Sequence, residues 1–289
     1  MTGPVSARET GPRVALRTAL DVCAFVDRLP PDGAGELLVT RGGALVRGAV
    51  FVEGGRICWA AARGLAPRLT ELLLETSGLA SGEMEEHFRR CKDEGVPLGE
   101  FLVGHGVIAA SELRAALLQH TTESLAALCE EGASACWWAR HGGYNPRWTF
   151  STSELLVRWG GHVHRAMVEH TDEVLAPFSS SAPEEWGALF LRDPAFAAPI
   201  PVASRGDLPA SASAMLRIGR WAASALDVAC SLGDEDVFLT ALEEGGSALV
   251  AWRHGYAIVA GRMEAQGPAR VLNRRAASRR AASAGLPVT

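Results

Sequence analysis

The feature that most constrains the fold is a helical pattern that occurs twice in succession, over residues 68–91 and 97–120. Each copy predicts an apolar helix, a glycine-centred turn, a serine suited to capping and a second helix. The turn and capping residues of the two copies are Gly78, Gly106, Ser81 and Ser111. No residue type suited to catalysis recurs at matching positions, so the repeat favours recognition over chemistry.

Strand-like sequence stands on both sides of this repeat. Before it, three apolar runs over residues 35–61 are separated by two Gly-Gly pairs, which predicts a meander with tight hairpins. Strand-like sequence resumes at residues 133–140, so residues 66–131 are expected to be an insertion between the third and fourth strands of one sheet. A helix over residues 14–29 is the nearest cover for the apolar face of this sheet, and another helix is expected over residues 153–174.

A second domain is expected after a Ser/Pro-rich linker at residues 177–183. Its pattern predicts two short strands, a long alanine-rich helix, three further strands and an arginine-rich last helix. We therefore predict an α+β chain with a flexible tail at residues 1–13 and two domains, residues 14–176 and 184–289. Each domain is expected to be a small antiparallel sheet packed with helices, and the first carries the inserted tandem helix-turn-helix repeat.

Composition excludes several classes of function. Of the 289 residues 48% are apolar, but the apolar runs are short and interrupted, so a sizeable core and no membrane span are expected. The net charge of −5 gives no basic field that would recruit nucleic acid. The N-terminus lacks the apolar core of a signal peptide, and the six cysteines are scattered without a CxxC pair, which favours a cytoplasmic location with reduced thiols.

The sequence carries none of the common catalytic or metal-binding motifs. It has no Gly-x-Ser-x-Gly, His-Glu-x-x-His, Gly-x-Gly-x-x-Gly or phosphate-binding loop. The densest histidine group, His162, His164 and His170, diverges around a helix, and the acidic turn at residues 233–236 has no further ligand spacing. We therefore expect no catalytic residue, no metal and no cofactor. A deep polar pocket lined by shifted titratable groups would be the sign of an unrecognised enzyme.

Two motifs of the first domain carry a family resemblance. They are Gly-Ala-Val-Phe-Val-Glu-Gly-Gly-Arg-Ile-Cys-Trp-Ala at residues 48–60 and Phe-Ser-Thr-Ser-Glu-Leu-Leu at residues 150–156. They resemble the strand meander and the closing helix of the PATAN family of bacterial regulatory modules, and with their flanks they cover roughly a third of the chain. The resemblance implies a protein-interacting domain, with a response regulator among the expected partners.

The helical repeat resembles the N-terminal helical units of type II secretion and type IV pilus assembly ATPases, in which a related pattern can bind cyclic di-GMP. The residues that match this pattern are Arg68, Leu69, Leu98 and Gly99. The first copy has Thr70 in place of the pattern's glycine, and the second has Pro97 in place of its arginine, whose planar donors would stack on or bond a guanine. A cyclic di-GMP-binding regulator is the alternative function, and a structural or protein-contact role of the repeat is preferred.

The second domain, over residues 186–282, is similar in element order to the roadblock (dynein light chain) family. That order is helix, two strands, helix, three strands, helix, and the first helix is missing here unless the helix over residues 153–174 serves this domain. The resemblance implies a homodimer and contact with a small Ras-like GTPase. Small residues on the long helix suit either packing on its own sheet or a dimer face.

The preferred function is thus a non-enzymatic, cytoplasmic adaptor of bacterial signalling or polarity that binds protein partners through its C-terminal domain. Arginine and tryptophan are enriched where proteins bind one another. The expected partner-binding residues are Arg217, Arg220 and Trp221 of the long helix and Arg274 and Arg275 of the last helix.

Overall fold

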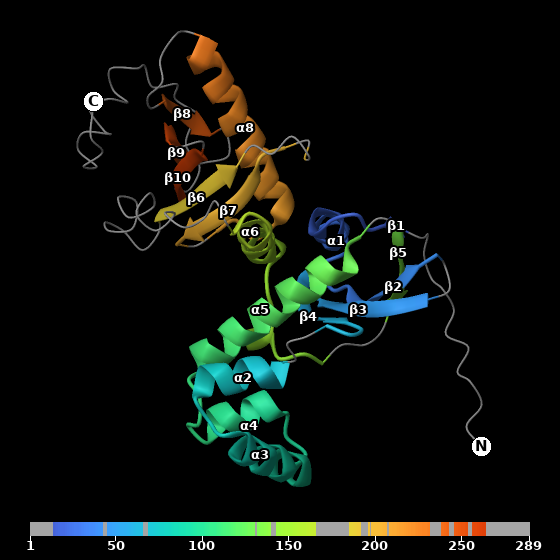
Figure 1. Cartoon of the computed structure of the whole chain (residues 1–289). Coiled ribbons are helices and arrows are strands. Elements are labelled where there is room, and N and C mark those ends of the chain that lie inside the picture. The colour runs from blue at the N-terminus through green and yellow to red at the C-terminus, as the bar shows by residue number, and fades with distance from the viewer. Residues whose placement is uncertain are drawn as a thin grey trace. The chain divides into compact units, whose positions relative to one another are not determined.

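The fold is given by a computed structural model, in which the chain divides into an N-terminal unit, residues 1–150, and a C-terminal unit, residues 151–289 (Figure 1). Both units combine helices with an antiparallel sheet, which confirms the α+β class. The structure describes residues 14–42, 45–65, 69–130, 132–139, 143–165, 185–191, 196, 198–206, 208–231, 238–242, 246–253 and 256–263. Arg68, Arg274, Arg275 and the expected tail and linker lie outside the described residues.

The sheet of the N-terminal unit has five antiparallel strands in the order β1-β5-β2-β3-β4. The strand that follows the repeat, β5, pairs with β2 and not with β4, with Leu37 opposite Trp137. This confirms that the repeat is an insertion within one sheet. The strands are β1 (Val14–Ala15), β2 (Ala34–Arg41), β3 (Leu45–Glu53), β4 (Arg56–Ala62) and β5 (Ala133–Ala139).

The predicted meander is confirmed, and its glycines show why. Gly54 and Gly55 adopt φ values of 59° and 69°, the left-handed conformation that a tight hairpin requires at both central residues. Gly35 has a different role. A Cβ on it would overlap the carbonyl oxygen of Trp138 and lie 2.7 Å from the Cζ2 atom of Trp137, so a larger residue would not fit at this point of β2.

The first helix is shorter than expected. The sequence predicts a helix from residue 14, but residues 14 and 15 form β1, and α1 spans Ala19–Val26. Its start is set by Asp21, whose carboxylate accepts the backbone N–H of Arg17 at 2.8 Å and of Thr18 at 2.9 Å. Phe25 packs its ring 5.7 Å from that of Trp137, so α1 contributes to the core of the sheet as expected.

The repeat forms α2 (Leu69–Ser77), α3 (Ser81–Glu94), α4 (Leu98–Gly104) and α5 (Ala110–Leu128). The glycine turns are confirmed, with φ of 66° at Gly78 and 67° at Gly106. The expected serine caps are wrong. Instead, Glu83 and Glu112 each reach back to a backbone N–H, that of Ala80 at 2.9 Å and that of Ala109, three residues earlier.

The repeat has a hydrophobic core of its own. Figure 1 shows α5 running from the α2–α4 bundle to the sheet, where it packs mainly on β4. The buried residues of this core are Leu72, Leu73, Met84, Cys91, Phe101, Leu102, Ile108, Leu113 and Ala116. The helix α5 therefore belongs to both cores and joins the insertion to the sheet.

The C-terminal unit begins with α6 (Thr152–Val163), about 25 residues before the expected linker. This helix packs on β7 and α8, and the N–H of Ala212 donates to Thr152 Oγ1 at 2.9 Å. The sheet order is β7-β6-β10-β9-β8. The other elements are β6 (Glu185–Leu191), β7 (Ile200–Arg205), α8 (Ala212–Ser231), β8 (Phe238–Leu242), β9 (Gly246–Arg253) and β10 (Tyr256–Met263).

The domain boundary therefore differs from the expected one, and the physical reason lies in α6. Its two adjacent glycines allow a close approach that larger residues would prevent: a Cβ on Gly161 would lie 2.7 Å from the carbonyl oxygen of Val202, and one on Gly160 would overlap that of Pro201. This close contact between α6 and β7 places the helix on the sheet of the C-terminal unit. The sequence pattern placed it with the first sheet because it follows the fourth strand directly.

Candidate interaction surfaces

The long helix α8 presents two of the expected partner-binding arginines to solvent. Arg217 and Arg220 are exposed, and Trp221 beside them is half-buried. On the opposite side, a Cβ on Gly219 would lie 2.8 Å from the Phe190 ring and 3.1 Å from the Pro199 carbonyl oxygen. The small residues of α8 therefore pack on their own sheet, which decides between the two roles left open by the sequence.

The two edges of the C-terminal sheet are protected differently. The edge strand β7 contains Pro201, which has no N–H to offer a further strand, and α6 packs against it. The other edge strand, β8, is hydrogen-bonded to β9, and within the described residues no strand pairs with its other side. The backbone groups on that side of β8 are a template for pairing with another chain.

Of the four residues expected to bind a nucleotide, the three that the structure describes have packing roles in the repeat. Leu69 and Leu98 are half-buried and pack against its core. Gly99 lies against α5, where a Cβ would come within 2.9 Å of both methyl groups of Leu113. The shared pattern of the two copies is thus accounted for by helix packing.

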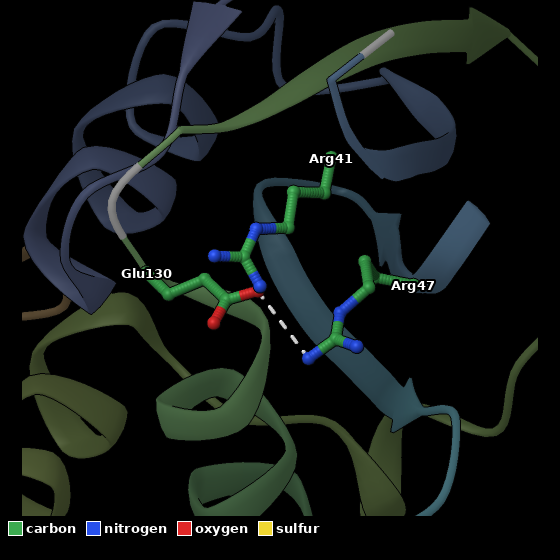
Figure 2. Close-up of polar contacts among 3 residues, drawn as sticks. All are labelled: Arg41, Arg47 and Glu130. Carbon is green, nitrogen blue, oxygen red and sulfur yellow. Dashed lines mark ion pairs between the residues drawn. The ribbon is translucent and has the colours of Figure 1, made fainter. Parts of the chain in front are cut away.

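A cluster that sequence reasoning missed lies at the end of the N-terminal sheet (Figure 2). Arg41 at the end of β2 and Arg47 in β3 both approach Oε1 of Glu130, at 3.6 and 3.3 Å. Glu130 follows the C-terminus of α5, where positive charge is favoured by the helix dipole. About 90 residues separate the arginines from the glutamate, so no sequence spacing could have signalled the cluster.

A second polar cluster holds the segment that leads out of the N-terminal unit. Arg56 on β4 donates to Thr149 twice, from Nε to Oγ1 at 2.6 Å and from Nη2 to the carbonyl oxygen at 2.9 Å. Arg114 on α5 donates to the same carbonyl at 3.4 Å and lies over the ring of Phe150. Thr149 is therefore hydrogen-bonded both to the sheet, through Arg56, and to α5 of the inserted repeat, through Arg114.

The titratable groups whose pKa values are shifted are buried or half-buried in the N-terminal unit. Burial raises the pKa of Cys23 and raises that of Cys58 and of Cys129 to about 12, so these thiols stay protonated and weakly nucleophilic. Burial lowers the pKa of His120, whose ring stacks on Trp59 with centroids 4.4 Å apart. No three His, Cys, Asp or Glu side chains gather as metal ligands in the described part of the chain.

Among the helices that the structure describes, none is long and apolar enough to cross a lipid bilayer. No protein-family model, curated protein or solved structure matches the chain. The resemblances noted in the sequence therefore stay predictions.

Proposed function

We propose that the protein is a non-enzymatic, cytoplasmic adaptor of bacterial signalling or polarity, which binds other proteins through its C-terminal unit. The observation that carries the proposal is the outer edge of β8, which pairs with no strand among the described residues, next to α8 with its exposed Arg217 and Arg220. The order of elements supports it as well. With α6 the unit reads helix, two strands, helix, three strands, which is the beginning of the roadblock order.

The outer edge of β8, unpaired within the described residues, supports homodimerisation as the mode of assembly. An edge strand satisfies its outward N–H and C=O groups best by pairing with another strand, and a second copy offers the same edge related by twofold symmetry. Antiparallel pairing of β8 with its counterpart would join the two sheets into one. The other edge is unsuited because of Pro201 and α6.

The arginines of α8 supply the contact with a further partner. Two guanidiniums and a half-buried indole on one helix are the residue types that dominate binding energy at protein interfaces. Their planar donors match carboxylates, so the surface suits an acidic patch on a small Ras-like GTPase, the partner class that the roadblock resemblance implies. A response regulator is the corresponding proposal for the N-terminal unit.

The dimer is tested by sedimentation velocity of the wild type and of two proline variants, Leu239→Pro and Thr240→Pro. N–H groups of successive strand residues point to opposite sides, so one substitution removes a donor to β9 and the other an outward donor. We expect a dimeric wild type, one variant that is a folded monomer and one that is destabilised. A wild type that stays monomeric at high micromolar concentration would contradict this mode of assembly.

The nucleotide alternative has a direct test of its own. Because Leu69, Leu98 and Gly99 are accounted for by packing, we expect no heat when cyclic di-GMP is titrated into the protein at high micromolar concentration. Saturable binding that Arg68→Ala abolishes would instead favour a second-messenger receptor.

A further inference from the structure

We propose that the N-terminal unit carries a second docking surface, which takes a segment of a partner protein with a carboxylate next to an aliphatic side chain. The surface, here called the hairpin end, consists of Arg41, Leu45, Val46 and Arg47, with Glu130 between the two arginines. It lies within residues 1–150, so it goes beyond the function proposed for α8 and β8 and does not depend on it.

The hairpin end carries more positive than negative charge, with two arginines and one glutamate. Two guanidiniums share one carboxylate oxygen, at 3.6 and 3.3 Å (Figure 2). Both distances exceed the 2.7–2.9 Å of a closed charge-assisted hydrogen bond, so Glu130 holds the two arginines as loose ion pairs. The side chain of Arg41 is 56% exposed, so a carboxylate from solvent can reach its donor fork. Oε1 of Glu130 is itself buried, so a partner's carboxylate would bind the exposed donors of Arg41 and not replace Glu130.

The apolar part of the hairpin end is adjacent to these charges. Leu45 is 55% and Val46 41% exposed, which leaves two neighbouring aliphatic side chains in water. Leu45 is the cross-strand partner of Arg41, so these two side chains share one face of the hairpin, and Arg47 follows at the register shift between β2 and β3. An aliphatic side chain of a partner can therefore cover Leu45 while its carboxylate meets a guanidinium.

The chemistry favours a protein segment over a membrane surface. Recognition of anionic lipids generally uses clusters of about 4–8 basic residues, whereas the hairpin end has two arginines with one carboxylate between them. The chain as a whole has a net charge of −5, which an anionic bilayer repels. The planar guanidinium is also the better match for a carboxylate, which it can bind through two parallel hydrogen bonds.

The test is a selection from a random peptide library displayed on phage, with the full-length protein as bait and the Arg41→Glu/Arg47→Glu double variant for counter-selection. We expect enriched peptides that place Asp or Glu beside Leu, Ile or Val. Affinities of the enriched peptides are then measured by fluorescence anisotropy. The double variant should weaken binding about tenfold or more, because two attractions become repulsions.

Two further variants separate docking from loss of structure. Glu130→Gln removes the negative charge between the two arginines and should strengthen peptide binding about threefold, whereas a merely structural ion pair would predict weaker binding. Leu45→Ser should weaken binding without a change in the circular dichroism spectrum. Arg89→Glu is the matched control, because Arg89 is an exposed arginine on α3 whose ion-pair partner is Glu86 of the same helix. It should leave binding unchanged.

Three results would overturn the proposal: no enrichment that depends on Arg41 and Arg47, weaker binding by Glu130→Gln, or equal loss in Arg89→Glu. Binding of the wild type to phosphatidylglycerol vesicles, lost in Leu45→Ser and without peptide enrichment, would assign the hairpin end to a lipid surface instead. Sedimentation velocity of the same variants keeps the outcome separate from the proposed dimer, since none of these substitutions touches β8.

Discussion

Replacing Gly160 by alanine tests the assignment of α6 to the C-terminal unit. At an open position in a helix, glycine to alanine raises the free energy of unfolding by about 1 kcal/mol, because alanine restricts the unfolded chain more than glycine does. At Gly160 the new Cβ would overlap the carbonyl oxygen of Pro201 and lie 2.9 Å from Cγ2 of Ile200. Since the overlapped atom belongs to the backbone of β7, it cannot rotate away and the helix must move.

The expected magnitude follows from these two opposing effects. Overpacking of a close contact costs about 1–3 kcal/mol, and a backbone obstacle places this site at the upper end. After subtraction of the helix-propensity gain, we expect the free energy of unfolding to fall by about 2 kcal/mol. For a unit of this size that corresponds to a melting temperature lower by about 8 °C. Gly161→Ala should follow with a smaller loss, because its Cβ would lie 2.7 Å from the Val202 carbonyl oxygen.

Urea denaturation followed by far-ultraviolet circular dichroism and by tryptophan fluorescence measures this loss, because Trp159 on α6 is buried and packs edge-on against Phe196. Gly82→Ala in α3 is the control, since its Cβ would have no neighbour within 4 Å. Gly82→Ala should raise the free energy of unfolding by about 1 kcal/mol, the gain expected at an open helical position. A Gly160→Ala protein at least as stable as the wild type would refute the close packing of α6 on β7.

Three further predictions concern the N-terminal unit. Because burial lowers the pKa of His120 below its ordinary value of 6.5, the unfolded chain binds a proton more readily than the folded one, so the free energy of unfolding should fall as the pH drops from 7 towards 5. His120→Phe, which keeps an aromatic ring against Trp59, should flatten that dependence in urea titrations. Leu102→Ala should lower the free energy of unfolding by about 3 kcal/mol, because Leu102 is fully buried in the core of the repeat. Amide hydrogen exchange should become faster within residues 69–128. Arg56→Ala should lower the free energy of unfolding, measured by thermal denaturation, by about 2 kcal/mol, because Thr149 loses two hydrogen bonds. Arg56→Lys should recover only part of this loss.

Much of the secondary structure could be predicted from sequence because its causes are local. A pair of glycines between two strands favours a tight hairpin, because glycine adopts the left-handed conformation that its turn requires. Gly54 and Gly55 do so here. The same reasoning identified Gly78 and Gly106 as the turns of the repeat. The helix starts were less predictable, because the N-cap positions are Ala80 and Ala109, one and two residues before the expected serines, and the glutamates at positions 83 and 112 accept the N–H groups of these alanines.

The candidate surfaces were only partly predictable. Arg217 and Arg220 were expected to bind a partner because of their residue type, and the structure places both exposed on α8, while their role stays a prediction. The domain boundary was not predictable from composition, because α6 is assigned by the fit of Gly160 and Gly161 to β7. A Ser/Pro-rich stretch marks where a chain is easily extended, and carries no information about which sheet the preceding helix contacts.

By itself, then, the sequence determined the α+β class, the hairpin at Gly54 and Gly55 and the glycine turns of the repeat, since each depends on residues close together in the chain. Only the tertiary structure decided which sheet α6 joins and which charges meet. With 28 basic and 33 acidic residues, many ion pairs are compatible with the sequence. Arg41 and Arg47 meet Glu130 because β5 returns beside β2 and brings the end of α5 with it, a contact that local sequence cannot encode.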